Sequence, residues 1–151
     1  MTEVRTNMLS HRTTSRVIYG DTDKMGFAYN ANYLRWFEIG RTELFRSLGI
    51  TYREIESKGI FLPVAEVYCR FITPVEYDDL LVIETSIDLK VKGGMKFDYQ
   101  LYHENGQDVI ATGYTKHPCV DREGRVVRPP RFLREFIKQK HDRRQRDPID
   151  E

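Results

Sequence analysis

Cysteine and histidine are scarce in this sequence, and their scarcity excludes two classes of protein. The 151 residues include two cysteines and four histidines. Cys69 and Cys119 lie far apart and form no Cys-x-x-Cys pair. We therefore expect small buried thiols in a reduced, cytoplasmic protein rather than a disulfide framework. The histidines are scattered, without the HxH or HExxH spacing of a metal site, so no metal is expected.

Long apolar runs and a strong net charge are also missing. No stretch approaches the roughly 18 apolar residues of a membrane span, and residues 1–16 lack the apolar core of a signal peptide, which favours the cytoplasm. The net charge is only +1, so nucleic-acid binding is not expected. Basic residues gather at 138–146, at the start of the charged tail, where five Lys or Arg stand against one acidic residue. For this tail a solvated terminus is the main interpretation and contact with an anionic membrane a minor one.

The composition that remains is that of one globular domain. The chain is 40% hydrophobic and 31% charged, with nine Tyr, eight Phe and one Trp. A chain of this length buries roughly two thirds of its unfolded surface. No segment repeats at a period of 20–50 residues, which excludes solenoids and propellers. We expect a loose lead-in at residues 1–13, a domain at 14–138 and a charged tail at 139–151.

Apolar spacing predicts a long helix from residue 31 to residue 48. Asn30 is a suitable N-cap residue, and Gly49 a suitable C-terminal stop. Gly40 lies on the apolar face. The side chains of that face are too bulky to remain in water, so a large element must cover them. They recur at helical intervals: Tyr33, Trp36, Phe37, Leu44, Phe45 and Leu48.

The rest of the chain is predicted to be mostly strands. A short helix is expected first, because Thr51 to Glu54 form a capping-box pattern and Gly59 follows. Another short helix is expected at 131–140. Alternating apolar and polar residues mark antiparallel strands joined by hairpin turns in a meander. The predicted strands are residues 14–20, 61–75, 80–92, 95–104 and 108–120.

This order of elements predicts an α+β fold. One long central helix and one curved antiparallel sheet of five to six strands must bury each other, so we expect the sheet to wrap around the helix. A single sheet leaves free strand edges, and edge pairing is expected to make a dimer.

The segment from Tyr19 to Tyr33 contains the candidate chemistry. Asp21 and Asp23 lie two residues apart in a glycine-bounded loop that leads into the long helix. The first N–H groups of a helix lack acceptors within the helix and carry partial positive charge, so they polarise a carbonyl placed against them. A nearby carboxylate can attack that carbonyl or activate water toward it. Because Asp is also common in ordinary turns, the loop alone leaves a purely structural role open.

The same segment carries a family resemblance. Asp-x-Asp-x-x-Gly at 21–26, followed by Tyr-Asn-Ala-Asn-Tyr at 29–33 and Glu-Ile-Gly-Arg at 38–41, resembles the hotdog-fold acyl-CoA thioesterases of the 4-hydroxybenzoyl-CoA thioesterase family. The nearest branch is the one associated with the bacterial Tol–Pal gene cluster. The resemblance extends over about residues 14–138. It implies a hotdog fold, an acyl-CoA substrate, and a homodimer or homotetramer with its active site at the dimer interface.

The resemblance assigns roles to individual residues. Asp23 aligns with the family's catalytic carboxylate, which acts as nucleophile or as general base. Asn30 aligns with the residue at the helix start whose backbone N–H polarises the thioester carbonyl. Many members of the branch have His there and the aromatic-substrate enzyme has Tyr, so proton transfer by a His side chain is lost here while the backbone N–H remains. Gly26 is expected to leave room for the substrate, and Asp21 to hold the loop. The mechanism needs no cofactor.

Other residues have two interpretations each. Tyr29 and Tyr33 flank the helix start and either line the acyl site or pack in the core. Lys90, Lys92 and Lys96 share the polar face of a predicted hairpin and either bind the phosphates of coenzyme A or face solvent.

The function predicted is hydrolysis of an acyl-CoA thioester to a free acid and coenzyme A. A non-catalytic acyl-CoA-binding protein or regulator on the same fold is the main alternative, but a binder has no need of Asp23. A dehydratase acting on 3-hydroxyacyl thioesters would need a His–Asp or His–Glu pair, and no His lies near the Asp motif or on the long helix.

Overall fold

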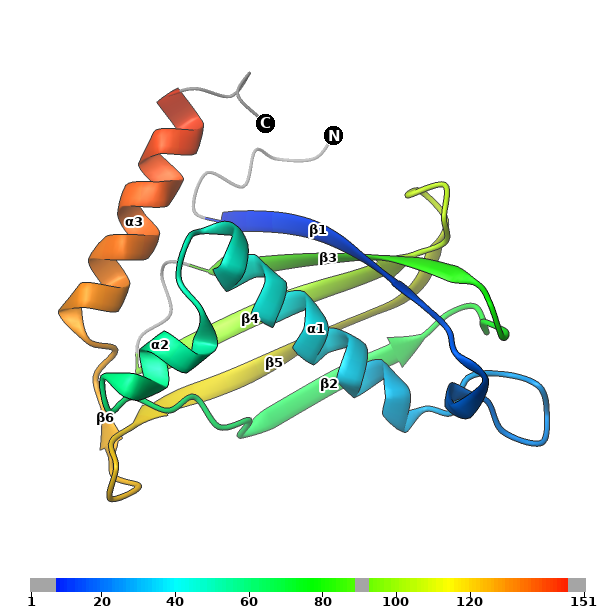
Figure 1. The fold of residues 1–151 in the computed structure, drawn as a ribbon, viewed down its shortest axis with the longest axis horizontal. Helices are drawn as coiled ribbons and strands as arrows, with labels where there is room; N and C mark the ends of the chain where they lie inside the picture. The colour runs from blue at the N-terminus through cyan, green and yellow to red at the C-terminus, as the bar shows by residue number, and fades with distance from the viewer. Residues whose placement is uncertain (1–7, 89–92, 147–151) are drawn as a thin grey trace.

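The computed structural model describes residues 8–88 and 93–146. Helix α1 (Ala31–Ser47) confirms the predicted long helix and lies against one face of a β-sheet (Figure 1). The helix ends before Gly49, whose φ of +90° lies in the left-handed region that favours glycine. Its sheet-facing residues are buried as expected: Tyr33, Trp36, Phe37, Gly40, Leu44 and Phe45.

The first turn of α1 differs from its prediction. Asn30 occupies the N-cap position, but its side chain makes no capping hydrogen bond, so the predicted side-chain cap is wrong. The reason is its backbone: φ is −53° and ψ is −37°, whereas a capping residue needs an extended conformation. Backbone groups close the turn instead. The Asn32 N–H donates to the Tyr29 carbonyl at 3.0 Å, and the Tyr33 N–H donates to the Asn30 carbonyl at 3.2 Å.

The sheet has six strands, and all its pairings are antiparallel, which confirms the α+β class. The strands follow the order β1-β3-β4-β5-β2, and β6 pairs with β5. Their bounds are Met8–Arg16 for β1, Glu66–Phe71 for β2, Leu80–Asp88 for β3, Gly94–Tyr102 for β4, Val109–Val120 for β5 and Val126–Val127 for β6.

The first strand begins earlier than its predicted start at residue 14. Strand β1 pairs with β3 along its whole length, from Met8 opposite Asp88 to Arg16 opposite Leu80. Residues 19–21 form a 3-10 turn, so residues 19 and 20, predicted as the end of the strand, lie outside it. The early part of β1 contributes one large apolar residue to the core, Leu9, so its alternation was too weak to mark a strand.

The predicted meander is correct for β3, β4 and β5 but wrong for β2. Strand β2 pairs with β5 at the edge of the sheet. The connection from β2 to β3 therefore crosses the end of the sheet. The hydropathy pattern of β2 does not indicate which strand it pairs with, so this pairing was not predicted.

Helix α1 approaches the sheet closely at Gly40. A Cβ atom at this position would lie 2.8 Å from the Ile83 side chain and closer still to Thr85. Beside this contact, the Phe37 ring stacks on the Tyr99 ring with 4.2 Å between centroids. Glycine at 40 thus sets how near the helix lies to β3.

A chain of polar groups is buried in the core between α1, β4 and β5. The hydroxyls of Tyr99 and Thr115 are 2.6 Å apart, and the Thr115 hydroxyl is 2.8 Å from His117 Nε2. His117 Nδ1 is 2.9 Å from the carbonyl of Leu62, which fixes the neutral ring with its proton on Nδ1. Burial lowers the pKa of His117 to about 4. Burial raises the pKa of Tyr99, and the positive charge of Arg41 partly offsets this rise.

The two remaining helices add buried apolar side chains to the core, Ile55 from the shorter helix and Leu133 and Ile137 from the longer one. Helix α2 (Tyr52–Ser57) has the predicted cap, because the Glu54 N–H donates to Thr51 Oγ1 at 3.1 Å. Helix α3 (Arg131–Arg146) is longer than the predicted 131–140 and stands at the end of the sheet away from the start of α1 (Figure 1). No helix in the described part of the chain is long and apolar enough to cross a membrane.

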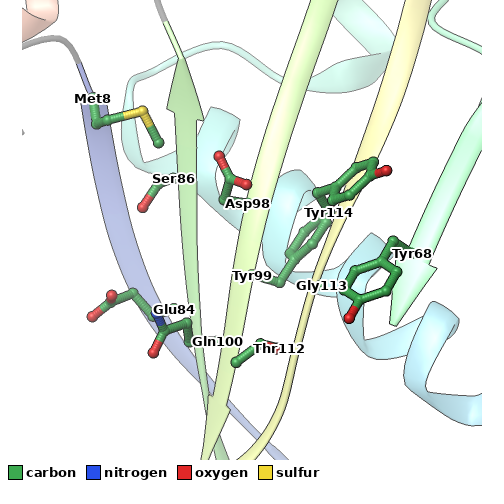
Figure 2. A pocket seen from close by; sticks show the side chains of 10 residues that line it. All are labelled: Met8, Tyr68, Glu84, Ser86, Asp98, Tyr99, Gln100, Thr112, Gly113 and Tyr114. Atoms are coloured by element: carbon green, nitrogen blue, oxygen red, sulfur yellow. The ribbon is translucent and has the colours of Figure 1, made fainter. Parts of the chain in front are cut away.

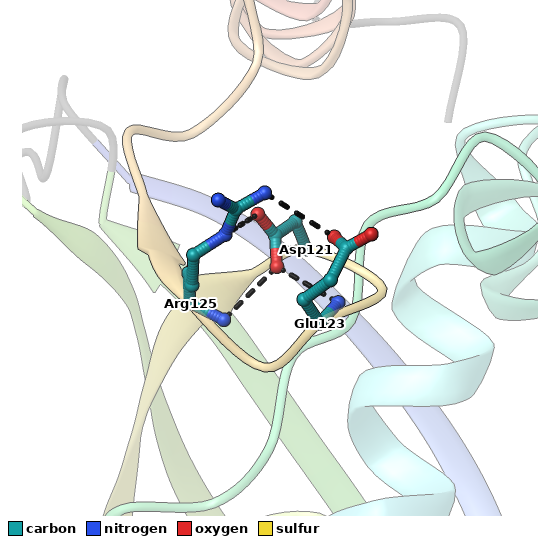
Figure 3. A network of polar contacts seen from close by, with 3 residues as sticks. All are labelled: Asp121, Glu123 and Arg125. Carbon is teal, nitrogen blue, oxygen red and sulfur yellow. Dashed lines mark hydrogen bonds and ion pairs between the residues drawn. The ribbon is translucent and has the colours of Figure 1, made fainter.

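The turn between β5 and β6 is fixed by one carboxylate. Asp121 Oδ1 accepts the backbone N–H groups of Glu123 at 3.0 Å and Arg125 at 2.9 Å, and Oδ2 accepts Arg125 Nε at 3.0 Å (Figure 3). These hydrogen bonds lower the pKa of Asp121. The predicted hairpin at 121–124 is therefore present, with Gly124 at a φ of +80°.

Candidate active site

Asp23 lies in a small closed loop between the 3-10 turn and α1. Its backbone N–H donates to the Phe27 carbonyl at 3.0 Å, and its carbonyl accepts the Gly26 N–H at 3.0 Å. Asp23 Oδ1 accepts the N–H of Met25 at 2.9 Å, and the side chain is half-buried. The loop thus holds the carboxylate in place and keeps it accessible.

Gly26 is required by the shape of this loop. Its φ is +85°, a conformation that other residues rarely adopt. A Cβ atom there would meet no atom within 4 Å, so glycine serves the backbone conformation rather than a close contact within this chain.

The helix start follows the loop directly. Asn30 and its side chain are exposed at the N-terminus of α1. The N–H groups of the first helical turn carry the positive end of the helix dipole. The loop that carries the Asp23 carboxylate is therefore followed within a few residues by the hydrogen-bond donors of the first turn of α1.

Asp21 holds these two parts together, which agrees with its expected structural role. Its carboxylate accepts the Ile18 N–H at 2.9 Å and Arg35 Nη2 at 2.6 Å. Its carbonyl accepts the Tyr29 N–H at 2.8 Å and Asn32 Nδ2 at 2.7 Å. The side chain of Asp21 is only 5% exposed.

Arg35 and Asn32 were not singled out from the sequence. The contact between Arg35 and Asp21 joins residues 14 positions apart, and spacing within the helix does not reveal it.

The connection between β2 and β3 closes the site from the other side. The Ala28 N–H donates to the Val75 carbonyl at 2.9 Å, and Phe27 forms a bridge with Glu76. The Asp23 loop, the start of α1 and the end of β2 therefore meet at one corner of the molecule.

The two predicted tyrosines are placed differently. Tyr29 is 58% exposed beside the loop, whereas Tyr33 is 3% exposed. The Tyr33 ring packs edge-on against Trp36 at 5.0 Å and Phe71 at 4.8 Å, and burial raises its pKa. Tyr33 is therefore a core residue within this chain. A substrate contact for either tyrosine stays a prediction.

Exposed apolar side chains gather around this corner. They come from the 3-10 turn and the residue before it, the Asp23 loop, the first turn of α1, the end of β2 and the segment after it. A cluster of this kind marks a binding surface for a partner or a ligand. Its members are Ile18, Tyr19, Met25, Phe27, Tyr29, Leu34, Phe71, Ile72 and Tyr77.

The structure does not bring Lys96 to this corner within one chain. Lys96 lies on the face of β4 opposite α1, 3.7 Å from Asp98 and 4.9 Å from the ring centroid of Tyr114. Lys90 and Lys92 lie outside the described residues. Binding of the phosphates of coenzyme A by these lysines stays a prediction.

A separate hollow of about 420 Å³ lies on the outer face of the sheet (Figure 2). Its two carboxylates are already engaged, since Glu84 pairs with Arg12 at 2.8 Å and Asp98 with Lys96 at 3.7 Å. Its lining comes from the strands alone and includes neither Asp23 nor Asn30. Among the described residues, no group of three or more His, Cys, Asp or Glu is arranged to hold a metal ion.

Comparison with known proteins gives a consistent result. Residues 17–139 match the family model described as the thioesterase-like superfamily. A putative acyl-CoA thioesterase, YneP, of Bacillus subtilis is 36% identical over 121 residues, covering 80% of this chain and 85% of the relative. The acyl-CoA thioesterase YbgC of Haemophilus influenzae is 34% identical over 107 residues, covering 70% of this chain and 77% of the relative.

The fold also has close counterparts among solved structures. The DHNA-CoA thioesterase from Staphylococcus aureus superposes with a TM-score of 0.79 over 92% of this chain and 93% of its own. At 24% identity, this likeness concerns the fold. It agrees with the α+β architecture and the strand order found here.

Proposed function

Because this chain belongs to the thioesterase-like superfamily, we propose that it is an acyl-CoA thioesterase and that Asp23 and the start of α1 form its active site. The observation that carries the assignment is the closed loop that holds Asp23 next to the N-terminus of α1. The hotdog arrangement, with the sheet wrapped around α1, is part of the same proposal, as are the Tol–Pal branch and a cytoplasmic location.

The reaction is R–CO–S–CoA + H₂O → R–COOH + HS–CoA. The thioester carbonyl oxygen lies against the backbone N–H groups at Asn30, which stabilise the negative charge that forms on this oxygen when the carbonyl is attacked. The C–S bond then breaks, and the thiolate of coenzyme A leaves and takes up a proton. Both steps use groups of the chain and no cofactor.

Asp23 supplies the attacking oxygen by one of two routes. As a general base it takes a proton from water, and the resulting hydroxide attacks the carbonyl. As a nucleophile it attacks the carbonyl itself, forming a mixed anhydride that water then hydrolyses. Both routes need the ionised carboxylate, so both predict the same effect of neutralising it.

The apolar side chains around Asp23 suit an acyl group and a partner subunit. Gly26 leaves the tip of the loop open to substrate, and Tyr29 is exposed beside it. Strand β2 is an edge strand of the sheet. It lies next to this corner, because its last residue, Phe71, packs against Tyr33 of α1. A second copy paired at β2 covers the site, which gives a homodimer, or a homotetramer of two such dimers.

The test is thiol release from short-chain, long-chain and aromatic acyl-CoAs by wild type and Asp23→Asn. The substitution keeps the shape of the side chain and removes its charge. We expect kcat to fall by roughly 100-fold or more, the usual scale of a general acid–base contribution. Asp142→Asn is the matched control, because Asp142 lies on α3 at the other end of the molecule and is exposed.

The same assay separates the alternative function. A wild-type protein that binds acyl-CoA without releasing thiol is a binder or regulator. Thiol release that is equally fast in Asp23→Asn excludes Asp23 from the mechanism.

A further inference from the structure

We infer that Asp21 and Arg35 are a positioning pair that sets the placement of the Asp23 carboxylate relative to the helix N-terminus. The inference rests on the proposed function, since it concerns how the two halves of that site are held. Neither side chain needs to contact the substrate for this role.

Asp21 is attached to both ends of the Asp23 loop. It directly precedes the loop, and its carbonyl accepts the Tyr29 N–H at 2.8 Å where the loop ends. Asp21 therefore holds both ends of the Asp23 loop, one through the peptide chain and the other through this hydrogen bond. Helix α1 also contacts Asp21. Asn32 Nδ2 in the first turn donates to the Asp21 carbonyl, and Arg35 Nη2 in the second turn donates to its carboxylate.

The ion pair between Asp21 and Arg35 also favours one position of the helix relative to the loop. The Asp21 side chain is 5% exposed and the Arg35 side chain 43%, so the carboxylate is desolvated and depends on its partner. At 2.6 Å the contact is a short charge-assisted hydrogen bond. Both charges therefore favour one position of the helix relative to the loop.

A shift of α1 relative to Asp21 changes the distance between the Asp23 carboxylate and the N–H donors at the helix start. Catalysis is sensitive to such shifts, since a misplacement of about 1 Å can cost about 100-fold in rate. Loss of the pair is therefore expected to lower kcat while substrate binding is largely kept.

The test uses Arg35→Met, Arg35→Lys and Asp21→Asn, each with steady-state kinetics and thermal unfolding. For Arg35→Met and Asp21→Asn we expect kcat to fall by roughly 10- to 100-fold with KM within about threefold. Arg35→Lys keeps the charge and is expected to recover part of kcat. Arg46→Met is the matched control, because Arg46 pairs with Glu43 at 3.3 Å on the last turn of the same helix; its kcat is expected to stay at the wild-type value.

The double variant Asp21→Asn/Arg35→Met separates positioning from general loss of stability. Residues that act as one unit are non-additive, so its kcat should be no lower than that of the worse single variant. Wild-type kcat in both single variants, with Asp23→Asn inactive, overturns the inference and leaves the proposed function intact. A raised KM at unchanged kcat in Arg35→Met also overturns it, because Arg35 then binds substrate directly. Wild-type activity in Asp23→Asn contradicts the proposed active site, whereas absence of thiol release by the wild type contradicts the proposed function.

Discussion

At the scale of single residues, Asn30 contributes to the proposed site through its backbone, because its side chain caps nothing. We expect Asn30→Ala to keep most of the activity. Asn30→Pro removes the N–H, and the φ of −53° is close to the value that proline imposes. Its kcat is expected to fall by about 10²–10³, the usual effect of deleting one oxyanion donor. Steady-state thiol release from the two variants checks this, and equal activity in both would remove the Asn30 N–H from the mechanism.

How far single residues could be predicted depends on how local their contacts are. Asp23 and Asp21 stood out because glycines and a helix start surround them within a short stretch. Arg35 did not, since its partner lies across the loop. Tyr33 had two interpretations because a tyrosine on an apolar helix face fits both. Its burial depends on Phe71, which packs against it from a strand far along the chain and which no local pattern indicates.

At the scale of elements, the buried polar chain from Tyr99 to His117 joins β4, β5 and the segment at Leu62. Burial lowers the pKa of His117 from 6.5 to about 4, so the unfolded chain binds this proton more readily. The free energy of unfolding is therefore expected to be highest above pH 6.5 and to fall as the pH drops toward 4. The loss from this group is on the order of 3 kcal/mol. Below pH 4 this contribution levels off.

Urea unfolding at several pH values, for wild type and His117→Asn, measures the contribution of His117 to the free energy of unfolding. Carboxylates affect both proteins alike, so the difference between them isolates the histidine. That difference should shrink as the pH falls from 6.5 to 4. A constant difference over this range would show that His117 does not titrate in this way.

Elements were predictable where one residue pattern decides the structure. Helix α1 has an apolar face of large side chains that only a helix brings together, and α2 has its own cap. Strand β1 was placed too late because hydrogen bonds to β3, rather than apolar alternation, define most of its length. The place of β2 beside β5 is a property of the whole sheet, and no pattern within residues 66–71 specifies it.

At the scale of the whole molecule, the free edge at β2 and the apolar corner beside it are expected to form the contact between two copies. Ile72, which follows β2 and is 51% exposed, tests this. We expect Ile72→Asp to weaken the dimer by at least about 10-fold in Kd, the effect of about 1.4 kcal/mol, and to lower activity with it. Sedimentation across a concentration series measures the Kd.

Val126→Asp is the matched control, since Val126 is 69% exposed on β6 and outside the corner. It should leave both the association and the activity unchanged. A monomeric wild-type protein with full activity would contradict an active site completed by a second copy.

The crossing from β2 to β3 has a consequence for the order of events during synthesis. All residues of the proposed site have been translated by residue 35, but the hydrogen bond from Ala28 reaches Val75, and β1 pairs with β3. Contacts so distant in sequence form late and slow the folding rate. A nascent chain that ends before β3 therefore carries every proposed catalytic group and is still expected to be inactive, so we expect activity to begin only after residues 80–88 of β3 have left the ribosome.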